Sequence, residues 1–436
     1  MASAVTTPAK QLQQRIKSRE ATVGVVGLGY VGLPLSISFA RAGFPVLGFD
    51  TDSRRVAQVN DGEQVMRHIP RKAMRELAQG GEATADFARL GEADAVLICV
   101  PTPLDQHHQP DMSYVEAAAD AIAATLRKGQ LVALESTTWP GTTRELLLPR
   151  LEASGLRAGE DFFLAYSPER EDPGNANYGI GDIPKVVGGH TDACRDVAVA
   201  LYESVVPRTI PVSSPETAEA TKLMENIFRA VNITMVNELK LVLDRMDVNI
   251  WEVVDAAATK PFGFMPFYPG PGMGGHCIPV DPFYLAWRAK EFNTTARFIE
   301  LAGELNMAMT EHVGHRLIRA LNDDGKAIRG SRIMLLGVAY KRNIDDTRES
   351  PAGRLLELLE VKGARISYHD PFVAEYRGRK STPLTARALR DCDAALVVTD
   401  HDDVDYALVG EHVPLVVDTR NVMASLSDVK ARVVRA

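Results

Sequence analysis

A loop-forming segment, residues 261–282, carries a cysteine at position 277. A thiolate can add to an aldehyde and hold it as a covalent adduct, although a lone cysteine is also often a small buried hydrophobic residue. Gly274 and Gly275 leave backbone N–H groups accessible, and Asp281 follows four residues after Cys277. Six prolines and five glycines exclude a regular helix or central strand, so we predict a functional loop.

A glycine fingerprint stands near the start of the chain: Gly27-Leu28-Gly29-Tyr30-Val31-Gly32. It follows a predicted strand and precedes a predicted helix, the context in which backbone N–H groups bind a pyrophosphate. Asp50 ends the next strand about 20 residues on, where a carboxylate accepts hydrogen bonds from the adenosine ribose and repels a 2′-phosphate. We therefore predict NAD rather than NADP, despite the neighbouring cations Arg54 and Arg55. A nicotinamide site and a positioned cysteine together predict oxidation of an alcohol to an acid.

Other polar side chains are less decisive. Lys222 and Asn226 are four residues apart in a predicted helix, so they share one face, which could be a polar site or simply solvated. His312 and His315 lack a third ligand pattern, so we predict an exposed helix there and no metal site.

The composition narrows the class of protein. The 436 residues are 45% hydrophobic and 24% charged, which is typical of a globular protein with two or three domains. The net charge of −8 argues against a nucleic-acid partner. Neither a signal-like segment nor an apolar stretch of about 18 residues is evident, so we expect a cytoplasmic protein with no membrane contact. Cys99 and Cys392 lie in apolar runs and are expected to be buried and reduced.

Residues 22–135 alternate apolar runs with helical patterns, which predicts a parallel sheet with crossover helices. The predicted strands are 22–26, 45–50, 94–101, 131–136, 162–166, 185–188 and 208–212. The C-terminal part repeats the pattern with strands at 332–338, 366–370, 394–399 and 415–418. In this repeat Asp370 corresponds to Asp50, and Asp393 to Asp94.

The second copy has Gly337-Val338-Ala339-Tyr340-Lys341 in place of the fingerprint. Without those glycines it should not bind a dinucleotide pyrophosphate in the same way. A purely structural role and the binding of another nucleotide both remain open. Lys341 and Arg348 are the candidate anion-binding residues.

Residues 213–246 form one long helical pattern, with Ser214 as its cap and Pro215 at its first position. About 30 residues would span about 45 Å. Its asparagines at 226, 232 and 237 are either exposed or face a polar site or partner helix. The predicted fold is α/β, with two Rossmann-like doubly wound domains joined by a long central helix and a helical dimerisation region. The predicted domains are 1–213, 214–310 and 311–436.

In addition, the sequence resembles the UDP-glucose/GDP-mannose dehydrogenase family from about residue 21 to its C-terminus. The shared motifs lie at 27–34, 100–103, 135–138, 166–170, 222–226, 274–281, 337–341 and 346–350. Segments 167–174 and 275–279 most resemble bacterial members that oxidise UDP-N-acetylglucosamine at C6 for surface-polysaccharide (O-antigen or capsule) synthesis.

The resemblance implies a four-electron reaction. The C6 hydroxyl loses a hydride to NAD, Cys277 adds to the aldehyde, a second NAD takes the second hydride, and the thioester is hydrolysed. Lys222 would stabilise oxyanions, Asn226 would orient the intermediate, and Asp281 would relay a proton. Glu169 is the implied general base.

One position departs from the family pattern. UDP-glucose members carry a second glutamate four residues after the first, where this chain has Pro173. Glu171 or an ordered water could take that role.

The resemblance also implies binding residues. Those for NAD are the fingerprint with Asp50, Arg55, Thr102, Thr137 and Arg348. Those for the sugar nucleotide are Glu169, Arg170, Lys222, Asn226, Tyr268, Gly274, Gly275 and Lys341. The C-terminal domain would hold the UDP moiety, and the long helix would pair two subunits in a homodimer or larger homo-oligomer.

Several alternatives remain for the reaction. UDP-N-acetylmannosamine, UDP-N-acetylgalactosamine and UDP-glucose are alternative substrates for the same chemistry. A two-electron hydroxyacid dehydrogenase would use a helix lysine and need no cysteine. A redox-sensing NAD-binding regulator would need an interaction surface that the acidic composition does not indicate.

Overall fold

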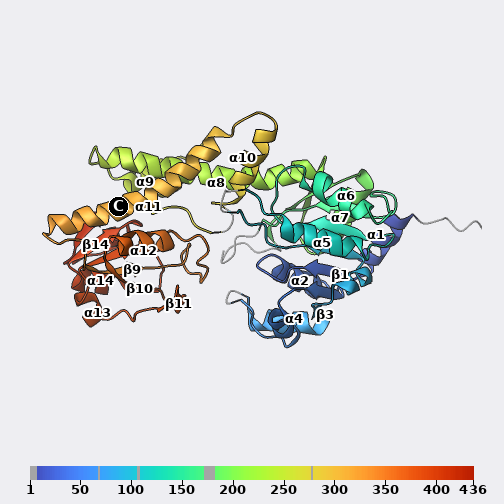
Figure 1. The fold of residues 1–436 in the computed structure, drawn as a ribbon, viewed down its shortest axis with the longest axis horizontal. Coiled ribbons are helices and arrows are strands. Elements are labelled where there is room, and N and C mark those ends of the chain that lie inside the picture. The colour runs from blue at the N-terminus through green and yellow to red at the C-terminus, as the bar shows by residue number, and fades with distance from the viewer. Residues whose placement is uncertain (1–6, 67–68, 106–108, 171–181, 276–277) are drawn as a thin grey trace, which may run out of the picture. The chain divides into compact units, whose positions relative to one another are not determined.

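The computed structural model describes residues 7–66, 69–105, 109–170, 182–275 and 278–436 (Figure 1). It contains two compact units. Unit 1 comprises Met1–Glu225 with Trp287–Asn293, and unit 2 comprises Asn226–Ala286 with Thr294–Ala436. Each unit holds one predominantly parallel sheet, which confirms the predicted fold class.

The sheet of unit 1 has eight strands in the order β3-β2-β1-β4-β5-β6-β7-β8. They are β1 Val23–Val26, β2 Val46–Phe49, β3 Gly81–Thr84, β4 Ala95–Ile98, β5 Leu131–Leu134, β6 Phe163–Tyr166, β7 Lys185–Gly189 and β8 Thr209–Val212. All neighbours are parallel except β6 and β7. The first six strands have the Rossmann order. β1, β2 and β4–β7 are buried throughout, which explains their unbroken apolar runs.

The helices of unit 1 cover this sheet. They are α1 Pro8–Lys17, α2 Gly32–Arg41, α3 Ser53–Asn60, α4 Arg71–Gly80, α5 Ser113–Ala123, α6 Leu148–Glu152 and α7 Asp192–Tyr202. α2 packs on β1 and β2, whereas α7 packs on β5–β8. The edge strand β3, sequence Gly-Glu-Ala-Thr, has no apolar run and was not predicted.

The sheet of unit 2 has five parallel strands in the order β10-β9-β13-β14-β15. They are β9 Arg332–Leu336, β10 Arg365–His369, β13 Ala394–Val397, β14 Leu415–Asp418 and β15 Arg432–Arg435. A separate two-stranded hairpin pairs β11 Glu375–Tyr376 with β12 Arg379–Lys380. The helices after β9 are α12 Pro351–Val361, α13 Ala386–Arg390 and α14 Tyr406–His412. This strand order is 2-1-3-4-5, the second common doubly wound arrangement.

The internal repeat extends to individual hydrogen bonds. In unit 1 the Asp94 carboxylate accepts from Thr22 N at 2.8 Å, and in unit 2 Asp393 accepts from Arg332 N at 2.8 Å. Each aspartate therefore fixes the start of the first strand of its own sheet.

The long helix α8 runs from Pro215 to Asp244, and Ser214 Oγ accepts from Thr217 N at 3.2 Å in its first turn. Its predicted cap and first proline are thereby confirmed. The other helices of this part are α9 Ile250–Ala258, α10 Asp281–Glu291 and α11 Arg297–Asp323. Across the described ranges, no helix combines the length and apolarity needed to cross a membrane. Cys99 and Cys392 are buried free thiols, as predicted.

Candidate functional site

The fingerprint loop of unit 1 has the geometry that a dinucleotide needs. Gly27 has a φ of +94°, a conformation that side chains rarely adopt. A Cβ on Gly32 would stand 1.9 Å from Gly27 O, whereas one on Gly29 would meet nothing within 4 Å. Two glycines are thus required by the turn, and the third leaves open space on the loop. The loop fits a pyrophosphate above the start of α2.

Asp50 and Arg55 both contact this loop. Asp50 Oδ2 accepts from Leu28 N at 3.0 Å, and Arg55 Nη1 donates to Leu28 O at 2.9 Å. Arg54 instead pairs with Asp52 at 3.2 Å, with its side chain 88% exposed. The structure therefore brings Asp50 and Arg55 together with the fingerprint at the predicted adenosine end.

Thr102 and Thr137 also lie at the carboxyl edge of this sheet, after β4 and β5. Thr102 is buried, and its hydroxyl donates to Thr137 O at 2.9 Å. Because parallel strands end at one edge, these loops and the fingerprint share the edge at which open α/β sheets bind ligands.

Glu169 and Arg170 follow β6 at the same edge. Lys222 Nζ, on α8, donates to Glu169 O at 2.6 Å, and the Lys222 side chain is buried. Arg170 pairs with Glu225 at 2.6 Å and donates to Pro184 O at 2.6 Å. Three predicted catalytic or substrate residues of unit 1 are therefore neighbours. Glu171 and Pro173 lie outside the described residues.

Glu219 is a residue that the sequence did not single out. Its buried carboxylate accepts from Gly141 N at 2.6 Å, Thr143 N at 2.9 Å and Thr143 Oγ1 at 2.7 Å. Burial raises the pKa of Glu219 to about 7, although these hydrogen bonds act in the opposite direction. One turn before Lys222, it fastens α8 to the segment that follows Thr137. An acidic residue with apolar neighbours in a helix was the available signal.

In unit 2, the loop that leads to Cys277 is fastened by polar side chains of two helices. Asn237 of α8 is buried and accepts from Gly270 N at 3.0 Å. Thr310 of α11 donates to Pro271 O at 2.8 Å, and Asn306 accepts from Met273 N. The loop thus has a defined path up to residue 275. Cys277 and His276 lie outside the described residues.

Asn226 of α8 contacts Asp281, which follows Cys277 by four residues in the sequence. Asn226 Nδ2 donates to Asp281 Oδ2 at 2.5 Å, and both side chains are buried. Asn226 and Asn237 therefore both face polar partners, which resolves the two alternatives left open for them. Asp281 is the first residue of α10, so the helix fixes its backbone.

Gly274 and Gly275 pack against the motif that replaces the fingerprint in unit 2. A Cβ on Gly274 would stand 2.7 Å from Tyr340 Cβ, and one on Gly275 would stand 2.8 Å from the Tyr340 ring. Gly275 N donates to Arg348 O at 3.0 Å, and the Arg348 guanidinium pairs with Asp346 at 2.6 Å. Unit 2 therefore brings these glycines next to the segment of Arg348 and to the residue before Lys341.

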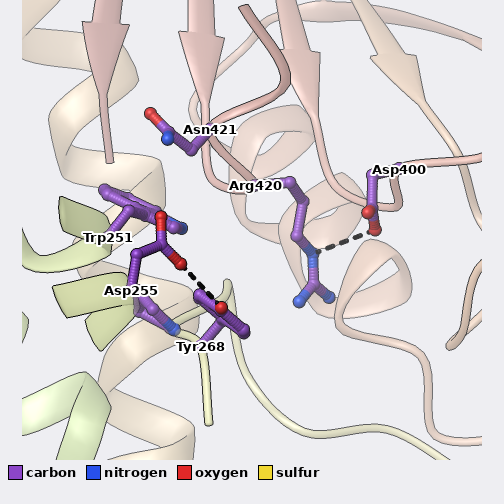
Figure 2. Close-up of a pocket in the computed structure, with 7 residues that line it drawn as sticks. Trp251, Asp255, Tyr268, Asp400, Arg420 and Asn421 are labelled. Carbon is purple, nitrogen blue, oxygen red and sulfur yellow. Dashed lines mark hydrogen bonds and ion pairs between the residues drawn. The ribbon is translucent and has the colours of Figure 1, made fainter. Parts of the chain in front are cut away.

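Unit 2 also contains a cavity of about 320 Å³ (Figure 2). Its lining residues are Trp251, Asp255, Tyr268, Pro269, Asp400, Arg420 and Asn421. Tyr268 donates to Asp255 at 2.7 Å, and Arg420 lies 3.9 Å from Asp400. Of the residues singled out from sequence, Tyr268 lines this cavity. Arg420 supplies a cation that sequence analysis missed.

In unit 2, backbone N–H groups of the segment that replaces the fingerprint donate to a carboxylate of the same unit. Asp370 Oδ2 accepts from Val338 N at 2.7 Å and from Ala339 N at 3.1 Å, and His401 Nε2 lies 3.0 Å away. His401 Nδ1 accepts from Asn343 N, so Nε2 carries the proton. Burial alone would raise the pKa of Asp370, but the hydrogen bonds from His401 and Val338 hold it below its ordinary value. This carboxylate is committed to its own domain.

The chain matches three consecutive models of one family. Residues 21–206 match the UDP-glucose/GDP-mannose dehydrogenase family NAD binding domain, residues 216–308 its central domain, and residues 334–425 its UDP binding domain.

Individual relatives cover most of the chain. A UDP-N-acetyl-D-glucosamine 6-dehydrogenase of Pseudomonas aeruginosa is 36% identical over 82% of this chain and 84% of its own. A UDP-N-acetyl-D-mannosamine dehydrogenase of Salmonella typhi is 36% identical over 92% of this chain and 99% of its own. The solved UDP-D-ManNAc dehydrogenase of Pyrococcus horikoshii superposes with a TM-score of 0.87 at 33% identity, covering 95% of this chain and 98% of that chain.

Proposed function

Because the chain belongs to the UDP-glucose/GDP-mannose dehydrogenase family, we propose that it oxidises C6 of UDP-N-acetyl-D-glucosamine to the carboxylate. At the family level it is an NAD-dependent oxidoreductase that acts on UDP-sugars. The proposed net reaction consumes one UDP-sugar, two NAD and one water and yields the uronic acid, two NADH and two protons. We further propose that the acid enters surface-polysaccharide synthesis.

The residues have the following proposed roles. NAD supplies the hydride acceptor when it is bound by the fingerprint, Asp50 and Arg55. Glu169 takes the proton of the C6 hydroxyl, and the Lys222 ammonium stabilises negative charge on the C6 oxygen. The Cys277 sulfur adds to the aldehyde carbon, and loss of a second hydride turns this adduct into a thioester. Water then attacks the thioester, which releases the acid and the thiol.

The contact between Asn226 and Asp281 is the observation that carries this proposal. A buried amide and a buried carboxylate at 2.5 Å need a reason to stay together, because burying polar groups costs free energy. Asp281 lies four residues after Cys277 in the sequence. The pair is therefore suited to orient the adduct and to deliver a water or proton.

The UDP moiety is assigned to unit 2. Its cavity volume of about 320 Å³ falls within the ordinary range for ligand pockets. Arg420 contributes a cation for a phosphate, and Trp251 and Tyr268 contribute aromatic surface for a base. Lys341 and Arg348 remain proposed anion contacts, Arg348 toward NAD.

UDP-N-acetyl-D-mannosamine is the second candidate substrate. Relatives named for the glucosamine and the mannosamine sugars are equally identical to this chain, at 36% each. The two sugars differ in configuration at C2, remote from C6. Motifs 167–174 and 275–279 favour the glucosamine sugar.

The test is the amount of NADH released per sugar, with limiting UDP-N-acetylglucosamine, UDP-N-acetylmannosamine and UDP-glucose in parallel. We expect two NADH per UDP-N-acetylglucosamine. With UDP-glucose, we expect the initial rate of NADH release to be less than about a tenth of the rate with UDP-N-acetylglucosamine. One NADH per sugar would contradict four-electron chemistry. Two NADH from the mannosamine sugar alone would replace the proposed substrate.

We also infer a homodimer through α8. Four exposed apolar side chains recur at helical spacing on this helix: Phe228, Met235, Leu239 and Val242. Met246 follows two residues after the end of the helix, and each of the five is at least 40% exposed, so together they form an apolar stripe. A two-fold axis would set the same stripe of a second copy against it.

Light scattering after size-exclusion chromatography should therefore give a mass near twice 47.5 kDa. Leu239→Glu, which places a charge in the stripe, should lower that mass toward one chain. Val361→Glu is the matched control, because Val361 on α12 is 86% exposed and lies outside the stripe. A wild-type mass of one chain would rule out the dimer.

A further inference from the structure

A buried charged cluster lies next to Glu169 in unit 1. Lys185 Nζ lies 2.6 Å from Glu135 Oε2, 3.2 Å from Pro168 O and 3.7 Å from Glu169 Oε2. The Tyr202 hydroxyl donates to Glu135 Oε1, and the Lys185 ammonium lies 5.1 Å from the Tyr202 ring centroid. Lys185, Glu135 and Tyr202 are each at most 5% exposed.

The strand order explains why these groups meet. Glu135 directly follows β5, and Ser167 directly follows β6. β7 runs antiparallel to β6, so its first residue, Lys185, starts at the edge where β6 ends. The Ser167 hydroxyl donates to Val186 O at 2.8 Å, which ties the Glu169 segment to β7. The cluster therefore contacts the Pro168–Glu169 segment through Lys185.

Stability alone does not explain why such a cluster is buried. A buried ion pair is commonly no more stabilising than well-packed apolar side chains of the same volume. Burial alone would lower the pKa of Lys185, but Glu135 and then Glu169 raise it above its ordinary value. One permanent cation is thus held between two carboxylates, one of which is the proposed base.

The geometry points to Lys185 and Glu135 as positioning residues that fix the Pro168–Glu169 segment and set the pH range in which Glu169 accepts a proton. This inference rests on the base role proposed for Glu169. The Lys185 ammonium attracts the Glu169 carboxylate at 3.7 Å, whereas Glu135 repels it when ionised. Burial raises the pKa of Glu135, although the Lys185 cation acts in the opposite direction. The charges of Lys185 and Glu135 therefore act on Glu169 in opposite directions.

Other titratable groups also face Glu169. Those with contacts or charge interactions in this part of unit 1 are Cys99, Tyr202, Lys222 and Arg170. Burial, the largest cause, raises the pKa of the Cys99 thiol and of the Tyr202 hydroxyl, so both are neutral at ordinary pH. The Lys222 ammonium bonds the backbone carbonyl of Glu169, and Arg170 pairs with Glu225. The four side chains remain in the variants, although Glu135 contributes to the raised pKa of the Cys99 thiol and of the Tyr202 hydroxyl.

The test is the pH profile of kcat/KM for UDP-N-acetylglucosamine in Lys185→Met and Glu135→Gln. Loss of the cation should move the acidic limb up by about one pH unit, and loss of the Glu135 charge should move it down by about half a unit. Because Lys185→Met leaves a buried carboxylate unpaired and could fail to fold, the double variant Lys185→Met/Glu135→Gln removes both charges. Its limb should lie between those of the two single variants.

NAD affinity, measured by protein fluorescence, should stay within about twofold of wild type in each variant that folds, because the fingerprint is not altered. A merely structural cluster would lower activity equally in Glu135→Gln and the double variant and leave the limb in place, which would overturn the inference while wild type still releases two NADH. Absence of NADH from wild type with every UDP-sugar would overturn the role of Glu169 and this inference together.

Discussion

Replacing Cys277 with alanine should lower turnover to the uronic acid by about 10³-fold or more, because the aldehyde can no longer be held as a covalent adduct. NADH per sugar should fall from two toward one in the same variant. The measurement is a single-turnover assay that follows NADH and the acid separately.

Cys392→Ala is the matched control for this prediction. Cys392 packs in the apolar core of unit 2, with its thiol donating to Ala388 O at 3.2 Å. Its variant should keep at least half of the wild-type kcat. Full turnover to the acid by Cys277→Ala would exclude the thioester route.

Replacing Lys222 with methionine should lower kcat by about 10²–10³-fold with little change in KM, because the ammonium stabilises charge that develops only in the transition state. Methionine is unbranched like lysine and one heavy atom shorter, and it loses the bond to Glu169 O. Steady-state kinetics with UDP-N-acetylglucosamine measure both constants.

Lys72→Met is the control for Lys222→Met. Lys72 lies on α4 with its side chain 88% exposed, and it forms a 3.8 Å ion pair with Glu76. Surface ion pairs of this kind contribute little to the free energy of unfolding, and Lys72 has no proposed role in the reaction, so kcat should not change. If Lys222→Met instead raised KM and left kcat intact, Lys222 would bind the substrate without stabilising the transition state.

Much of the fold could be predicted because its strands are buried on both faces. The sequences of β4 and β5 are unbroken apolar runs. The matching positions of Asp94 and Asp393 indicate the internal repeat, and both aspartates bond the start of their sheet's first strand. Edge strands behaved differently. β15, in which arginines flank two valines, is mostly exposed and has no such signal.

The site was predictable only in part. Lys222 and Asn226 share a helix face, but their spacing fitted a solvated face as well, and the resemblance to the family supplied their predicted roles. Glu135 and Lys185 are 50 residues apart and meet only because β7 reverses its direction beside β6. Strand direction is set by packing of the whole sheet, and no local pattern near Lys185 indicates it.

The committed carboxylate of Asp370 has a consequence for the order of events in catalysis. Within the described residues, the loop at 27–32 leaves open space at Gly29 beside Asp50, which bonds one N–H of that loop, whereas the equivalent acid in unit 2 accepts from Val338 and Ala339 and lies 3.0 Å from His401. In the part of the chain that the structure describes, one loop thus has the fingerprint geometry, whereas the proposed reaction needs two hydride transfers. Under that proposal the spent coenzyme would leave and a fresh one would bind between the two oxidations, so the aldehyde intermediate would have to stay bound during the exchange. Retention of that intermediate, rather than the speed of either hydride transfer, would then decide how much aldehyde escapes.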